Sequence, residues 1–431
     1  MSERDALTAA VLADPDDDLP RLVFADWLDE RGEPAHARFI RAQIALAALS
    51  EWDPQSAALR RTQPEWDCSA ELVHTLPQLT SDDGIYGGLH WDRAQPFRRG
   101  FAHGIQVPAL TALQTRMPAL LVEHPLRRLG LYSATLDQWR EFAASPWLPR
   151  ISEIDFEGLG APIEAMRELL ASPGGIGLRA LRFGSSVSAG MPIVLERLLR
   201  SEVGDNLRTL ELANAFASDE SYFEDFLEAF QVGVEKLEAL RLRSMGFGGN
   251  HLHQFLVSRR WENLAELSIV DEKPGATGLS FLSYPDCWPL LRSLKLDGVD
   301  VTEKNPGPLA NNLRPPRLAV LDIANSLLSP QSFQALAKAD HLADLRVVRL
   351  RRMNLDNRGA RYLAKAKFWR NLVELDLRGN FIDENGAKHL IGRKPPENLE
   401  LLRIDDRFPE EFRARLCEHF GGKLVLEKVA V

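Results

Sequence analysis

The chain contains 431 residues, of which 45% are hydrophobic and 26% are charged, a composition typical of a globular protein rather than a disordered or fibrous one. Its formal net charge of −9 argues against a dedicated nucleic-acid-binding protein, whose binding domain is usually basic on at least one face. The sequence has no apolar run of about 18 residues and no secretory signal pattern, so we expect a soluble cytoplasmic protein with neither a membrane segment nor a nucleic-acid partner.

The first 50 residues predict a small module of three short helices. Residues 3–12 suit the first helix, and the proline and aspartates of residues 14–18 end it and favour the start of the next. The second helix is predicted within residues 19–32, where Gly32 ends it, and the third within residues 33–49. The apolar faces of the second and third helices carry Leu22, Phe24, Trp27, Leu28, Phe39, Ile40 and Ile44.

The stretch LADPDDDLPRLVFADWLDERGEPAHARFIRAQ, residues 12–43, closely resembles the N-terminal repeat-companion domain of planctomycete and myxobacterial proteins. The later stretch GGLHWDRAQPFRRGFAHGIQV, residues 87–107, is similar to the segment that leads those proteins into their repeats. This resemblance implies a bacterial origin and an association with repeats, and it carries no defined activity.

The aspartates at positions 14, 16, 17 and 18 also allow a calcium-binding interpretation. An EF-hand loop needs glycine at its sixth position and glutamate at its twelfth. Counted from Asp14, these positions hold Leu19 and Ala25. We therefore favour helix capping over metal binding.

Residues 51–100 predict a helix and loops that connect the module to the rest of the chain, since they contain Pro54, Pro64, Pro77 and the stretch SDDGIYGG. An array of repeats needs a cover over its exposed terminal core. We expect residues 1–100 to provide that cover.

From residue 101 onward the spacing LxxLxL recurs at a period of 27 residues. Seven consecutive copies begin at Leu237, Leu264, Leu291, Leu318, Leu345, Leu372 and Leu399. Earlier copies, at spacings of 25 to 30 residues, begin at Leu126, Ile151, Leu178 and Leu207. Each LxxLxL predicts a short strand, and the later copies are followed by a helical stripe such as Ile382, Gly386 and Leu390.

These repeats resemble the leucine-rich repeat family, and by length and helical half the ribonuclease-inhibitor type. The resemblance covers residues 101–428 and implies an α/β fold: a right-handed solenoid of about 11–12 repeats over residues 101–431, with a parallel inner sheet and outer helices. One feature departs from the family, which places Asn or Cys three residues after the last strand leucine. Only Asn380 obeys, which puts the curvature of the array in question.

Tryptophans recur just before the strands. Trp261, Trp288 and Trp369 each precede the first strand leucine by three residues, and Trp147 precedes Ile151 by four. An aromatic binding rim is one interpretation. We favour the other, in which each indole fills the gap between a helix end and the next strand, because large aromatics account for much of the buried area of a core.

The sequence shows no phosphate-binding GxxxxGK[ST], no GxSxG and no HExxH motif. Residues 174–177, GGIG, suit a helix end. His251 and His253 lack further ligands for a metal, and Cys417 beside His419 is only a weak thiol motif. The three cysteines, Cys68, Cys287 and Cys417, are too scattered for disulfides or zinc. We therefore expect a protein that is not an enzyme and has no cofactor and no metal.

One residue of each strand, the one inside LxL, points away from the core. In chain order these are Gly130, Asp155, Arg182, Glu211, Arg241, Ser268, Lys295, Asp322, Arg349, Asp376 and Arg403. Their charges nearly alternate from Asp155 onward, so neighbouring strands are expected to neutralise each other. This lowers the expectation of a phosphate-binding groove on the inner face.

Positive charge exceeds that pattern in one region. The candidate binding residues are Arg346, Arg349, Arg351, Arg352, Arg378 and Arg403, and Asp322, Asp376, Asp405 and Asp406 offset only part of their charge. A docking patch and a solvated row of charges are both open interpretations, and arginine is enriched at interface hot spots.

We expect a non-enzymatic protein-interaction scaffold, monomeric, that binds a protein partner on the concave face of the repeats. A regulator of a small GTPase is an alternative, because Ran GTPase-activating proteins have similar repeats. A substrate receptor of F-box-like layout is another, against which the bacterial-looking N-terminus counts. Fold alone does not choose among them.

Overall fold

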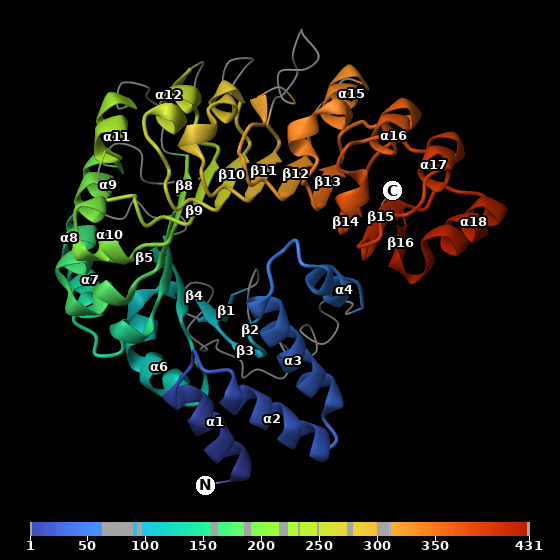
Figure 1. Ribbon diagram of the computed structural model, residues 1–431. Coiled ribbons are helices and arrows are strands. Elements are labelled where there is room, and N and C mark those ends of the chain that lie inside the picture. The colour runs from blue at the N-terminus through green and yellow to red at the C-terminus, as the bar shows by residue number, and fades with distance from the viewer. Residues whose placement is uncertain are drawn as a thin grey trace. The chain divides into compact units, whose positions relative to one another are not determined.

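The computed structural model (Figure 1) forms two compact units. The N-terminal unit comprises residues 1–50, 63–215 and 228–234, and the C-terminal unit comprises residues 51–62, 216–227 and 235–431. The structure describes residues 2–62, 89–92, 97–156, 163–184, 191–214, 223–231, 233–247, 250–273, 279–299, 310, 312–326, 328 and 330–428. The division of the chain at residues 50 and 100 that the sequence suggests stays a prediction.

The N-terminal unit begins with the three expected helices, α1 (Glu3–Ala13), α2 (Leu19–Glu30) and α3 (Pro34–Ala48). Asp17 accepts the N–H of Leu19 at 2.9 Å, so the aspartate-rich turn does satisfy a backbone donor at the start of α2. The module has its own apolar core, formed by Phe24, Ala25, Leu28, Ala37, Ile40 and Ile44.

The module packs against a two-stranded hairpin, β2 (Phe97–Arg98) and β3 (Phe101–Ala102). The ring of Phe101 lies 5.3 Å from that of Phe24, edge to face. Gly100 between the strands has φ +82°, and a Cβ there would lie 2.3 Å from Cγ1 of Ile40. Only glycine combines this backbone conformation with so close an approach of the module.

The sheet of the N-terminal unit has the order β1-β4-β5-β6-β7-β8. Its strands are β1 (His90–Trp91), β4 (Gly104–Ala109), β5 (Arg128–Ser133), β6 (Glu153–Phe156), β7 (Ala180–Phe183) and β8 (Thr209–Ala213). β1 pairs antiparallel with β4, and the rest are parallel. The intervening helices are α6 (Leu110–Glu123), α7 (Leu136–Ala143), η1 (Leu148–Arg150), α8 (Ile163–Ala171), η2 (Pro173–Gly177), α9 (Met191–Leu199) and α10 (Glu202–Asn206).

The C-terminal unit continues the pattern with eight parallel strands in chain order among its described residues. They are β9 (Ala239–Arg243), β10 (Glu266–Val270), β11 (Ser293–Asp297), β12 (Val320–Ala324), β13 (Val347–Arg351), β14 (Glu374–Asp376), β15 (Leu401–Asp405) and β16 (Leu424–Glu427). From β9 to β15, each paired residue lies opposite the residue 27 positions later in the next strand, as Leu240 lies opposite Leu267. The predicted repeat register is therefore confirmed there.

The helices of this unit lie on the outer side of its strands (Figure 1), except for α4 (Pro54–Thr62). They are α4 (Pro54–Thr62), α12 (His251–Val257), η4 (Leu279–Ser283), η5 (Pro285–Cys287), α15 (Pro330–Lys338), η6 (Asp340–Leu342), α16 (Asn357–Leu363), η7 (Trp369–Asn371), α17 (Glu384–Ile391), α18 (Glu410–Phe420) and η8 (Gly421–Lys423). The helix α11 (Phe223–Ala229) contains residues of both units. The expected α/β fold of stacked strand-and-helix repeats, with a parallel sheet inside and helices outside, is confirmed.

The tryptophans lie in the core. Trp261 and Trp288 are buried and stack with ring centres 6.4 Å apart. Their Nε1–H groups donate to the carbonyls of Leu256 and Phe281, at 3.0 Å each. These contacts confirm the packing interpretation over an aromatic rim.

Two of the turns that follow strands are held by different side chains. Asn380 accepts the N–H groups of Met353 and Leu355 and donates to the carbonyl of Leu350 at 2.6 Å. Glu272, at the same place in an earlier repeat, is buried and accepts the N–H of Met245. The carboxyl group of Glu272 thus accepts a backbone N–H of one repeat turn, as Asn380 does in another.

The longest helix among the described residues, α3, has 15 residues. None of the helices in those ranges is both long and apolar enough to span a lipid bilayer.

Candidate functional site

The six candidate arginines lie in three places on the C-terminal unit. Val348 and Leu350 point into the core from β13, so Arg349 and Arg351 emerge on the opposite, inner face of the strand. Arg403 lies on the inner face of β15, two strands away. Arg351, Arg352 and Arg378 lie at the C-terminal ends of the strands, and Arg346 is exposed just before β13.

The inner face of this unit is partly covered by α4. Ala57 is buried in an apolar cluster with Val373, Leu401 and Val425, which come from the strand region of the last repeats. Arg61 donates to the carbonyl of Glu400 at 2.7 Å, across 339 residues of sequence. The segment 51–62 therefore occupies part of the concave face on which a partner was expected.

Arg349 is held at the centre of an ion-pair cluster beneath α4. Its Nε and Nη2 donate to the two carboxylate oxygens of Glu374 at 2.6 and 2.9 Å. Glu51, just before α4, binds Nη1 of Arg349, and Arg60 of α4 lies 3.0 Å from Glu374. Two acidic and two basic side chains from segments far apart in sequence thus neutralise one another.

The pKa values within this cluster reflect that pairing. Burial opposes the charge on Arg349, but the hydrogen bonds and charge of Glu374, together with Glu51, outweigh it and raise the pKa of Arg349. Burial likewise opposes the charge on Glu374, and Arg349 and Arg60 nevertheless lower its pKa. Both groups remain charged at neutral pH.

The alternation of charge along the inner face is present in the register. Arg349 faces Asp322 on one side and Asp376 on the other, and Asp376 faces Arg403. The stronger partner of Arg349 is nevertheless Glu374, two residues before Asp376 on the same face of β14. That second inner row was missed, because only the residue inside each LxL was considered.

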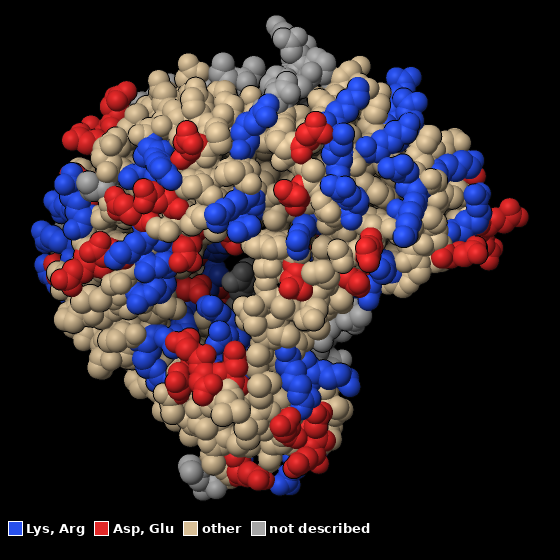
Figure 2. Space-filling model, in the orientation of Figure 1, with Lys and Arg blue, Asp and Glu red and all other residues tan. Residues whose placement is uncertain are grey.

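A hollow of about 450 Å³ lies at the C-terminal ends of these strands. It is lined by Asp297, Ala324, Asn325, Arg351, Arg352, Arg378, Gly379, Asp405, Arg407, Glu427 and Lys428. We call it the strand-end hollow. Figure 2 shows Lys and Arg side chains gathered over the part of the C-terminal unit that carries α15 to α17.

The arginines of the strand-end hollow differ in how far they are neutralised. Arg351 donates to both carboxylate oxygens of Asp322 at 2.9 and 3.0 Å, and Arg378 is held by Asp376 and Glu427. Arg352 is exposed and has no ion pair among the residues that the structure describes. Ion pairs therefore hold the guanidinium groups of Arg351 and Arg378 in place, whereas that of Arg352 is less constrained.

An aromatic side chain lies beside the hollow. Phe381 is 60% exposed, and the guanidinium of Arg407 lies 5.8 Å from the centre of its ring. Exposed aromatic residues next to arginine are typical of interface hot spots. Neither Phe381 nor Arg407 was among the predicted binding residues, although Phe381 directly follows Asn380, where a loop is expected.

The other candidate groups have structural surroundings. His251 stacks on Phe223 at 4.1 Å, and Nδ1 of His253 lies 2.7 Å from the hydroxyl of Ser280. Cys417 is exposed, and burial, with Asp286 nearby, raises the pKa of Cys287. Cys68 lies outside the described residues. No cluster of three or more His, Cys, Asp or Glu that could hold a metal occurs within the described ranges.

No family model matches the sequence, and no match is found among curated proteins. Among solved structures, a chain of the yeast Rad7–Elc1 complex is 15% identical over 95% of this chain and 92% of its own, with a TM-score of 0.46. An internalin (InlF) of Listeria monocytogenes is 14% identical over 71% of this chain and 80% of its own, with a TM-score of 0.37. These likenesses concern the fold alone and assign no function to this chain.

Proposed function

We propose that this protein is a non-enzymatic protein-interaction scaffold whose C-terminal unit binds an acidic segment of a protein partner at the strand-end hollow. The observation that carries the proposal is the convergence of Arg351, Arg352, Arg378 and Arg407 on one hollow beside the exposed ring of Phe381. Curved repeat arrays typically present such extended surfaces to proteins.

The chemistry of the hollow favours carboxylates on the partner. Guanidinium groups bind carboxylates through paired hydrogen bonds, and ion pairs inside the protein already hold Arg351 and Arg378 in place. Preorganised donors lose less side-chain freedom on binding than mobile ones do. Arg352 and Arg407 are exposed, and although Arg407 lies 3.7 Å from Asp405, both supply positive charge that steers an acidic segment towards the hollow.

The remaining predicted arginines take other parts in this proposal. Arg349 and Arg403 maintain the inner face around α4, since Arg349 already binds Glu51 and Glu374. Arg346, exposed at the opposite end of β13, adds only to the long-range field. The assignment of residues 1–50 to a bacterial repeat-companion domain is part of the proposal and rests on sequence resemblance.

Quantitative affinity capture tests the proposal. The full-length protein, the variant Arg352→Glu with Arg407→Glu, and the control Arg358→Glu with Arg361→Glu are each used as bait in lysate of the source organism. The control reverses the same amount of charge on α16, where both residues are exposed. We expect partners whose recovery falls at least about tenfold with the first variant and is unchanged with the control, and that elute at raised salt.

Equal recovery of every captured protein by both variants would exclude the strand-end hollow as the binding site. The nature of the lost partner distinguishes the alternatives, because a small GTPase would support a GTPase regulator and ligase subunits would support a substrate receptor. A metabolic conversion catalysed by the purified protein would contradict the non-enzymatic part.

A further inference from the structure

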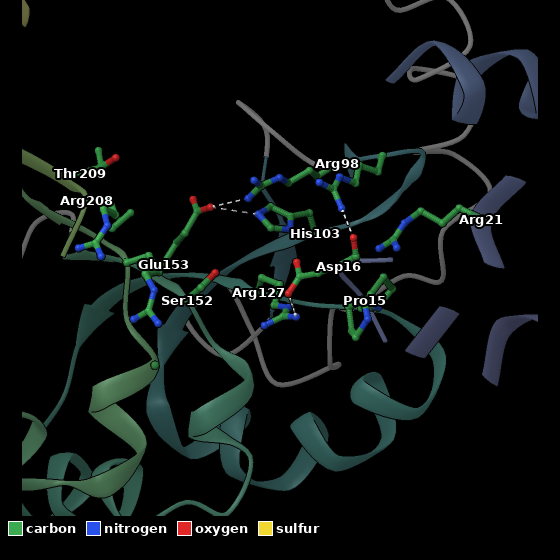
Figure 3. A pocket seen from close by; sticks show the side chains of 15 residues that line it. Pro15, Asp16, Arg21, Arg98, His103, Arg127, Ser152, Glu153, Arg208 and Thr209 are labelled. Atoms are coloured by element: carbon green, nitrogen blue, oxygen red, sulfur yellow. Dashed lines mark hydrogen bonds and ion pairs between the residues drawn. The ribbon is translucent and has the colours of Figure 1, made fainter. Parts of the chain in front are cut away.

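A second cavity, of about 370 Å³, lies within the N-terminal unit (Figure 3). It is bounded by the turn between α1 and α2, by the β2–β3 hairpin, and by the residues at the N-terminal ends of β5 to β8. Its lining contains six arginines: Arg21, Arg98, Arg99, Arg127, Arg179 and Arg208. Among the described residues, the carboxylates that line it with them are Asp16 and Glu153.

The repeat itself generates half of this arginine cluster. Arg127, Arg179 and Arg208 each stand immediately before a strand, at the same position of their repeats. Parallel strands lie about 4.8 Å apart, so this register places Arg179 and Arg208 on neighbouring rungs and Arg127 two rungs from Arg179. Ser152 occupies the rung between them and brings a hydroxyl group.

The other three arginines come from the helical module and the hairpin. Arg21 of α2 is only 3% exposed, and its Nη1 donates to the carbonyl of Asp17 at 2.9 Å. Its Nε is buried and has no hydrogen-bond partner among the described residues, and the same holds for Nε of Arg99. Buried donors without acceptors are rare in native proteins. Each of these two N–H groups is therefore available to a hydrogen-bond acceptor on a ligand.

The cavity holds more positive than negative charge. Asp16 binds Arg127 at 3.0 Å, Glu153 lies 3.1 Å from Arg98 and 3.5 Å from His103, and Asp18 lies 3.4 Å from Arg99. Arg21 and Arg179 form no ion pair with the described residues, so positive charge in the lining exceeds these three carboxylates, in a chain whose net charge is −9.

The neighbouring positive charges affect the pKa of the buried Arg21. Burial lowers the pKa of Arg21, and the charge of Arg99 lowers it further, while Asp18 and Asp16 oppose the shift. Gathering like charges in a partly enclosed space destabilises the fold unless an anion compensates it.

We propose that this cavity binds a compact anion that carries two adjacent phosphate groups, either as a free diphosphate or as part of a larger molecule. Guanidinium forks match phosphate oxygens in pairs. Figure 3 shows Arg21 reaching in from the helical side and Arg208 from the strand side, with Asp16, Arg127 and His103 between them. A single monovalent anion would compete poorly with the carboxylates already present, whereas a diphosphate offers enough charge to displace the 84%-exposed carboxylate of Asp16.

Two groups of side chains each bind one phosphate of the ligand. One phosphate lies against the strand ends, where Arg179, Arg208 and the hydroxyls of Ser152 and Thr209 line the cavity. The other lies against Arg21 and the β2–β3 hairpin. Because the ligand would join the module to the first repeats, its binding stabilises the N-terminal unit.

The test uses inorganic pyrophosphate and the full-length protein, with isothermal titration calorimetry and thermal unfolding in low-salt buffer. We expect one pyrophosphate per chain and a rise in the melting temperature of the N-terminal unit. The variant Arg179→Gln with Arg208→Gln should weaken binding at least about tenfold, the equivalent of 1.4 kcal/mol. The matched control is Arg197→Gln with Arg200→Gln, which removes two exposed arginines at the end of α9 in the same unit.

Sodium sulfate at equal ionic strength separates site binding from a general salt effect. An equal rise in melting temperature with sulfate, equal binding by both variants, or no heat with millimolar pyrophosphate would each overturn the proposal. Flotation with phosphatidylcholine vesicles, with and without an inositol bisphosphate lipid, then identifies the source. Vesicle binding that is lost with Arg179→Gln and Arg208→Gln indicates a lipid headgroup, and pyrophosphate binding alone indicates a soluble ligand.

Discussion

At the scale of single residues, Glu272 shows how a carboxyl group can replace the usual asparagine of a repeat turn. Its carboxyl group is 2% exposed and faces the backbone N–H groups of Met245, Gly246 and Phe247. Burial raises its pKa to about 7 although these three donors pull the pKa down. The folded protein therefore keeps a proton on Glu272 at pH values at which the unfolded chain has lost it.

This difference makes the free energy of unfolding depend on pH. Between the ordinary glutamate pKa, 4.5, and about 7, the folded state binds more protons than the unfolded state, so rising pH lowers stability. Replacing Glu272 by Gln removes the titration and keeps an oxygen that accepts the same N–H groups. We expect the stability of the variant relative to wild type to increase by about 1–3 kcal/mol from pH 5 to pH 8.

Urea unfolding at pH 5, 6, 7 and 8 measures this change. Glu384→Gln is a suitable control, because Glu384 lies near the surface of α17 and pairs with Lys388. Parallel stability profiles of wild type and Glu272→Gln would show that Glu272 titrates normally.

At the scale of elements, α4 differs from every other helix of the C-terminal unit among the described residues, because it lies against the inner rather than the outer side of the strands. A small apolar contact at Ala57 and ion pairs of Arg60 and Arg61 hold α4 against the strands. Replacing Ala57 by Glu buries a charge in the apolar cluster with Val373 and Leu401, where it loses its hydration.

The variant Ala57→Glu should release α4 without unfolding the repeats. Hydrogen–deuterium exchange is expected to rise at residues 54–62 and at β14 and β15, and to stay unchanged in the N-terminal unit. Gln55→Glu adds the same charge on the exposed side of α4 and should change little. Equal protection in both variants would mean that the contacts of Ala57 do not hold the helix.

At the scale of the whole molecule, the first hundred residues serve both units. Residues 1–50 pack within the N-terminal unit, and residues 51–62 belong to the C-terminal unit. Deletion of residues 1–100 would therefore damage both units at once. A deletion that ends at residue 50 isolates the part played by the helical module.

We expect deletion of residues 1–50 to destabilise the N-terminal unit and promote aggregation. It exposes Phe101 and removes the partner of Gly100, whose N–H donates to Gln43 at 2.6 Å. Light scattering and hydrogen–deuterium exchange should show losses confined to residues 97–215. A monomeric truncated protein with unchanged protection at β4 and β5 would show that the module is a separate tethered domain.

Much of the architecture could be predicted from local pattern. The period of 27 residues established the strands and their register, because a repeated strand can bury its leucines only by pairing with its copy. The same logic predicted the alternating charges of Asp322, Arg349 and Asp376. Among the described residues between β10 and β11, the helical segments are the short η4 and η5 rather than an α-helix, and Pro285 begins η5.

The sites depended on contacts that no local pattern records. One partner of Arg349 is Glu51, 298 residues away, and nothing in the sequence around residue 51 indicates an inner strand surface. Likewise the six arginines of the N-terminal cavity come from α2, a hairpin and three repeats, which the chain brings together only on folding. By itself the sequence determined the repeats, their register and the helical module, because these follow from the periodic burial of apolar side chains. Only the tertiary structure decided which charges meet, because electrostatic partners are chosen by distance in space.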